Sequence, residues 1–215
     1  LPFLLISFSL YVFSSWMHQW QNTKTTPAKT PGYQSLWKRV DSCEKKGLTN
    51  DAIKTVELIY NKAKAENNAP QFVKAVLHKM KFTQYKEEFS QEKTIEYLEK
   101  EVQSTSFPIR PILHSILADA YWQYYQNNRW KFQDRSTTVN FDKKDISTYS
   151  LKDLVNAAIL NHKSALGFAK QSKEVKLEVF DEILIKGNAP TRSWRPTLYD
   201  FLAHRALDFF KNSEA

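Results

Sequence analysis

Between positions 113 and 124, apolar side chains recur at intervals of three and four residues. The series comprises Leu113, Ile116, Leu117, Ala120, Tyr121 and Tyr124. An α-helix turns once every 3.6 residues, so this spacing gathers the six side chains on one face. A half-buried strand would alternate at every second residue instead. The segment therefore predicts an α-helix with one buried face, and any fold for this chain has to cover that face.

The same period runs through most of the chain after residue 32. We predict helices over 33–46, from Thr49 or Asn50 to about 66, from Pro70 onward, after Ser90, after Ser150 and after Pro196. Gly47 marks the end of the first of these, because glycine commonly follows the last residue of a helix. Successive helices joined by short turns predict an all-α domain over 33–215. Its antiparallel helical hairpins would stack as a bundle or as a short solenoid of the tetratricopeptide (TPR) type.

Three segments refine this prediction. Tyr60, Ala63 and Pro70 partly match a TPR unit, but the spacing does not recur over 71–108. The connection 127–150 is too long for a simple turn, and its aromatic residues indicate that it packs on the domain. Residues 174–184 fit either a strand or a helix, and we favour a helix because no partner strand is visible nearby.

Residue types with catalytic chemistry do not form a recognisable constellation. The whole chain has four glycines, too few for a phosphate-binding loop, and its single cysteine, Cys43, cannot form an internal disulfide. Asp200 and His204 share a helix face, but two ligands do not hold a catalytic metal. His114 and His162 are expected to be hydrogen-bonded core residues, and Asp119 to be solvated or capping. We therefore predict a protein that is not an enzyme and has no cofactor, catalytic residue or metal site.

The first residues have the character of an export signal. No charged side chain precedes Lys24, and the first 13 residues are almost wholly apolar, so 1–20 is predicted to be a cleaved signal peptide. The alternative is an uncleaved segment that tethers the protein to a membrane. Residues 21–32 are rich in Thr and Pro and predict a flexible linker. The expected location is the periplasm or cell envelope, and the lack of an initial Met suggests a chain truncated at its start.

Charge gives little indication of a nucleic-acid partner. The net charge is +8, but only Lys24 and Lys29 lie before residue 33, so the remainder carries 29 basic and 23 acidic side chains. These are mixed along the helices, as on solvated helix faces. The nearest basic and aromatic cluster runs from Arg129 to Arg135, and we interpret it as a packed loop. No nucleic-acid partner is expected.

The most distinctive segment is aromatic and spans 120–132. It is either packing between hairpins or an interaction surface, because Trp, Tyr and Arg dominate interface hot spots. The residues predicted for such a surface are Tyr121, Trp122, Tyr125, Arg129 and Trp130.

Four stretches together resemble the N-terminal helical region of large bacterial alpha-2-macroglobulin-like proteins. They are WKRVDSCEKKGLTNDAIKTVELIYNKAKAENNAPQFVKAVLHK (37–79), PILHSILADAYWQYYQNNRWKF (111–132), NFDKKDISTYSLKDLV (140–155) and RPTLYDFLAHRALDFF (195–210). The second and fourth are the most specific. The resemblance implies an exported endopeptidase inhibitor whose later β-sandwich domains trap a protease, in many members through a thioester formed within C-x-E-Q.

That motif does not occur in this chain, because Cys43 is followed by Glu44, Lys45 and Lys46. We expect a fragment: a non-catalytic helical interaction or scaffold module whose partners are the downstream macroglobulin domains or envelope proteins. Proteases would contact only the absent parts. The alternative hypothesis is a free-standing TPR-like adaptor of the bacterial envelope.

Overall fold

A computed structural model describes residues 31–86, 90–132, 145–185 and 193–212 of the chain. They form the α-helices α2 (Tyr33–Lys45), α3 (Thr49–Ala65), α4 (Ala69–Lys86), α5 (Ser90–Ser104), α6 (Ile109–Asn127), α7 (Leu151–Leu166), α8 (Ala169–Glu174) and α10 (Leu198–Phe210). Three short 3-10 helices join them: η1 (Arg129–Lys131), η2 (Ile146–Thr148) and η3 (Leu177–Phe180). The prediction of an all-α fold is confirmed for these residues.

Residues in the left-handed conformation reverse the chain after the first two helices. Gly47 has φ +70° and Asn67 has φ +52°, a conformation that glycine and asparagine adopt most readily. In both turns a backbone N–H reaches back to the end of the preceding helix: Leu48 donates to Cys43 at 2.8 Å and Asn68 to Ala63 at 2.9 Å. These bonds satisfy carbonyl groups that the helix end leaves free. The next helix can therefore return directly along the one before it.

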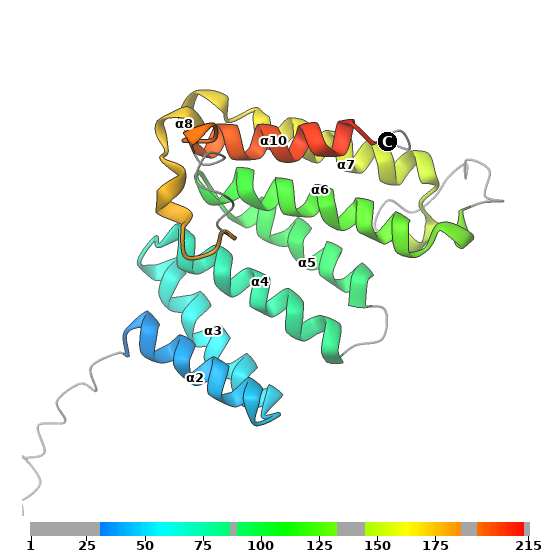
Figure 1. Ribbon diagram of the computed structural model, residues 1–215. Helices are drawn as coiled ribbons and strands as arrows, with labels where there is room; N and C mark the ends of the chain where they lie inside the picture. The colour runs from blue at the N-terminus through cyan, green and yellow to red at the C-terminus, as the bar shows by residue number, and fades with distance from the viewer. Residues whose placement is uncertain (1–30, 87–89, 133–144, 186–192, 213–215) are drawn as a thin grey trace, which may run out of the picture.

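The helices follow one another across the molecule in order of sequence (Figure 1). In this view α2, α4, α6 and α10 run in one direction and α3, α5 and α7 in the other. Each helix from α2 to α7 contacts the next one, and α4 also contacts α6, which in turn contacts α10. Trp37 Nε1 on α2 donates to Gln71 Oε1 on α4 at 2.6 Å, so the first members of neighbouring hairpins are also joined.

Two clusters of buried apolar side chains hold the helices together. The main one runs from Leu36 on α2 to Phe209 on α10 and includes Cys43, which is buried as expected of a structural helix position. The second gathers the N-terminal ends of α4, α6 and α10 around Phe180. Its buried members are Ala69, Val73, Ile112, Phe180, Leu198 and Leu202. The second cluster packs together the N-terminal ends of α4, α6 and α10, the three helices that form the candidate site.

The helix predicted over 174–184 is wrong for most of its length. Helix α8 ends at Glu174, and Lys176 then forms an isolated antiparallel bridge with Thr197. Leu177 N donates to Pro196 O, and Leu198 N donates to Val175 O, both at 2.9 Å. The chain continues as η3 and a turn. The segment with strand-like alternation therefore pairs with residues about 20 positions later in the sequence. A local pattern does not indicate a partner at that distance.

Several predictions concern residues outside the described parts of the chain. These are the leader at 1–20, nearly all of the linker at 21–32 and the middle of the connection 127–150. Gly32 is described as the N-cap of α2, at the predicted boundary between linker and domain. None of the described helices combines the length and the apolar content needed to cross a bilayer.

Candidate functional site in the groove over α4, α6 and α10

A groove of about 460 Å³ lies along the layer formed by α4, α6 and α10. Helix α6 supplies its floor, while α4 and α10 flank it. The lining is mostly apolar and consists of Val73, Leu77, Met80, Ile112, Ser115, Ile116, Asp119, Ala120, Gln123, Ile183, Leu184, Ile185, Phe201 and Arg205. A groove with apolar walls and a few polar groups is the usual form of a ligand-binding site.

One wall of the groove is the segment 177–185, which we call the strap. In Figure 1 it descends from α8 towards the N-terminal end of α4. Phe180 anchors it, because this side chain is only 1% exposed in the second core cluster. Glu182 accepts a hydrogen bond from Gln71 Nε2 on α4. The strap is therefore part of the folded domain, and Ile183 and Leu184 present aliphatic side chains to the groove.

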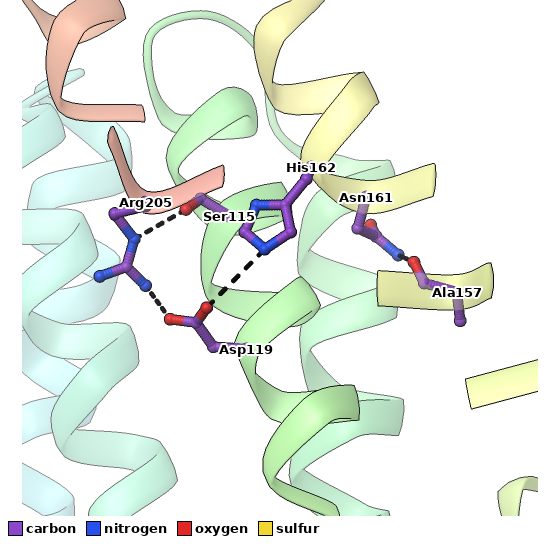
Figure 2. Close-up of polar contacts among 6 residues, drawn as sticks. All are labelled: Ser115, Asp119, Ala157, Asn161, His162 and Arg205. Atoms are coloured by element: carbon purple, nitrogen blue, oxygen red, sulfur yellow. Dashed lines mark hydrogen bonds and ion pairs between the residues drawn. The ribbon is translucent and has the colours of Figure 1, made fainter. Parts of the chain in front are cut away.

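Three polar side chains meet between α6 and α10 (Figure 2). Arg205 Nε donates to the hydroxyl oxygen of Ser115 at 2.8 Å, and Arg205 Nη2 donates to Asp119 Oδ2. Ser115 and Asp119 are four residues apart, so they share a face of α6 and Arg205 reaches both. Phe201 lies one turn before Arg205 and packs its ring 5.5 Å from the guanidinium carbon. Two hydrogen bonds and the contact with the Phe201 ring therefore hold the guanidinium group in place.

His162 lies behind this ion pair, on α7. Its side chain has no solvent exposure, and it packs against the Phe209 ring at 5.0 Å between centroids. Neither ring nitrogen has a hydrogen-bond partner among the described residues, and Nε2 is 4.0 Å from Asp119 Oδ1. Burial, with a smaller effect of Arg205, lowers the pKa of His162 to about 4. The imidazole is therefore neutral at pH 7.

Asp119 balances the charge of Arg205 within the groove. Burial raises the pKa of Asp119, and the neighbouring Arg205 opposes that shift. The side chains of Asp119 and Arg205 are 38% and 32% exposed, so the pair lies at the base of an open groove. Among the residues of the lining that the structure describes, these two are the only charged ones. Their charges balance each other.

The contacts define what this site can do chemically. Ser115 accepts from Arg205, and the contacts in Figure 2 do not join it to His162, so they are not those of a nucleophile and its base. No group of three His, Cys, Asp or Glu side chains suited to a metal occurs in the described residues. Arg205 Nη1 donates to none of the described residues and points away from Ser115 and Asp119 in Figure 2. It can donate to a ligand in the groove.

The structure separates the five residues predicted as an interaction surface. Tyr121 is buried, donates to Glu99 and stacks on Tyr149, so its placement on a surface is wrong. Trp122 and Tyr125 are half-buried and pack against the main core. Arg129 is exposed and bonds Gln126, and Trp130 is 71% exposed. Packing accounts for the first three residues, and the last two are exposed.

The other singled-out polar residues have structural partners. Asp200 forms a capping box with Thr197 at the start of α10. His114 bonds Asn161 at 2.8 Å, as expected of a core histidine, whereas the hydrogen bond expected for His162 is absent.

Sequence reasoning missed Asp119 and Arg205 as a pair. The available signal was the polar series of Ser115, Asp119 and Gln123 at intervals of four, beside the apolar face of the same helix. That series indicates a second, polar stripe on α6, although it does not identify the residue on α10 that meets it.

Comparisons with protein-family models, with curated proteins and with solved structures give no match for this chain.

Proposed function

We propose that this chain is a non-catalytic helical interaction module that holds a segment of a partner polypeptide in the groove over α4, α6 and α10. The observation that carries the proposal is the groove itself, which combines a mostly apolar lining with Arg205 Nη1, a donor that bonds none of the described residues. Apolar surface supplies binding free energy, and a few placed polar groups supply orientation.

The arrangement of helices favours a TPR-like solenoid over a closed bundle. Alternate helices pack side by side, as the contacts of α6 with both α4 and α10 illustrate. Such stacking leaves one layer of helices open as an extended binding surface. The groove lies on this layer.

The resemblance to alpha-2-macroglobulin-like proteins gives the proposal its wider context. Its two most specific stretches, 111–132 and 195–210, supply α6 and α10, which bear Ser115, Asp119 and Arg205. We propose an exported protein of the periplasm or envelope in which protease trapping belongs to other domains. The partner segment would come from those macroglobulin domains or from an envelope protein. A gene that continues into β-sandwich domains after codon 215 would support this context, and one that continues differently would favour a free-standing TPR-like adaptor.

Site-specific photo-crosslinking tests the groove as the binding surface. A photoreactive residue replaces Gln123, an exposed residue of the groove, or Leu160, which is 61% exposed on α7. In envelope extract we expect a defined polypeptide adduct from position 123 and none from position 160. Ala120→Phe, which fills the groove floor, should abolish the adduct. Equal labelling at both positions, or none at position 123, would refute the proposal.

A further inference from the structure

We infer that the groove selects an uncharged, aliphatic segment of its partner, and that one backbone carbonyl of that segment accepts a hydrogen bond from Arg205 Nη1. This inference rests on the proposed function and specifies the chemistry of the occupant. Three observations on the groove support it.

The first observation is the balance of charge. Asp119 and Arg205 already pair with each other, and the other described residues of the lining are uncharged. A charged side chain entering the groove would lose hydration without gaining an opposite charge. A carboxylate would also have to compete with Asp119 for Arg205. Neutral segments therefore bind with the lowest desolvation free energy.

The second observation is the geometry of Arg205. Nε and Nη2 are held by Ser115 and Asp119, and the ring of Phe201 supports the guanidinium plane. The remaining Nη1 is thus fixed in position before a ligand arrives, which lowers the entropy cost of binding. A neutral acceptor of the right size is a peptide carbonyl. A non-helical stretch or the C-terminal end of a helix supplies such a carbonyl, because carbonyls inside a helix are already bonded within it.

The third observation is that the chain already places such a segment in the groove. Ile183 and Leu184 of the strap pack beside the groove and against the second core cluster. Ile185 follows at the rim with 99% of its side chain exposed. A partner segment that lies beside the strap continues this existing aliphatic contact and buries Ile185 together with Leu77 and Met80 of α4, which also line the groove.

Binding of short peptides to the full chain tests the inference. The probes are three acetylated and amidated pentapeptides with the cores Ile-Leu-Ile, Ile-Asp-Ile and Ser-Ser-Ser. A Gly-Ser linker joins each peptide to a dye, and fluorescence anisotropy measures its binding. We expect Ile-Leu-Ile to bind at least about tenfold more tightly than the other two. Arg205→Met should weaken its binding by about tenfold, the size of one hydrogen bond to a charged group.

Two variants guard against misfolding as an explanation. Gln123→Trp narrows the groove from an exposed position and should weaken binding, whereas Leu160→Trp on α7 should leave it unchanged. Circular dichroism melting confirms that each variant is folded. Tighter binding of Ile-Asp-Ile, equal binding of Ser-Ser-Ser or no effect of Arg205→Met in a folded variant would overturn the inference. If position 123 still crosslinks a polypeptide in that case, the groove is a binding site and only the chemistry of its occupant is wrong.

Discussion

Asp119 on α6 and Arg205 on α10 form an ion pair between residues 86 positions apart in the sequence. Arg205 also bonds Ser115, so one side chain of α10 is held at two points one turn apart on α6. This relationship joins the two helices and holds the guanidinium of Arg205, a residue of the groove lining. Its contribution to stability can be measured apart from its role in binding.

Removing either partner of this pair should destabilise the domain modestly. Asp119→Ala leaves a partly buried guanidinium without its counter-charge, and we expect a loss of about 1–2 kcal/mol in the free energy of unfolding. Urea unfolding of Asp119→Ala, Arg205→Met and the double variant gives the coupling energy, expected to be about 1 kcal/mol. The control is the pair Lys100 and Glu96 on α5, whose side chains are 72% and 60% exposed. A coupling no larger than that of the control pair would show that solvent screens the groove pair completely.

Stability should fall as the pH decreases below 6.5, because His162 is buried as the neutral form. Its pKa is lowered from an ordinary 6.5 to about 4 in the folded state. As the pH falls through 6.5 the unfolded chain takes up a proton, whereas the folded chain does so only near pH 4. The loss of unfolding free energy from this residue should reach about 3 kcal/mol at pH 4. Burial lowers the pKa values of His78 and His114 in the same direction.

Urea unfolding between pH 7 and pH 4 measures this dependence. His162→Phe should reduce its slope, since phenylalanine fits among the rings of Phe209 and Phe210 and does not titrate. The residual slope comes from His78, His114 and the carboxyl groups with shifted pKa values, among them Asp119. The same substitution at His204, which is half-buried on α10, serves as the control. An unchanged slope in His162→Phe would show that His162 does not remain neutral in the folded protein.

Gly47 should be the glycine most sensitive to substitution. Its φ of +70° disfavours any residue with a Cβ atom, yet a Cβ there would meet no atom within 4 Å. Gly47→Ala should therefore cost about 1 kcal/mol through the backbone alone. Gly32→Ala is the matched control, because Gly32 has φ −66° and equally open space. Thermal unfolding compares the two, and an equal change in melting temperature would contradict the role assigned to the left-handed turn.

Local sequence patterns predict the helices of this protein well. Helix α2 begins at Tyr33, α3 at Thr49 and α5 at Ser90, each at or next to its predicted start. The capping boxes of Ser150 with Asp153 and of Thr197 with Asp200 are both present. These features depend on residues within one helical turn of each other, so they can be predicted from a short stretch of sequence.

The candidate site could not be predicted in the same way. Helical periodicity indicates which face of α6 is buried, but it does not indicate that α10 lies beside that helix. Asp119 meets Arg205 and approaches His162 only because α10 packs against the hairpin of α6 and α7. Lys176, just before the strap, shows the same limit, since its bridge partner is Thr197. Contacts over such distances follow from packing between elements, which is not encoded in the period of any one of them.

The aromatic block gives a prediction that separates packing from interaction. Tyr121 is 4% exposed and Trp130 is 71% exposed, although both were predicted for one surface. Tyr121→Ala removes a buried ring and should cost about 3–4 kcal/mol, whereas Tyr121→Phe loses only the hydrogen bond to Glu99 and should cost about 1 kcal/mol. Trp130→Ala should change stability by less than about 0.5 kcal/mol. Urea unfolding gives these values.

A Trp130→Ala variant as unstable as Tyr121→Ala would show that the indole is buried in solution. Reduced crosslinking from position 123 in a stable Trp130→Ala variant would show that Trp130 belongs to the surface that holds the partner.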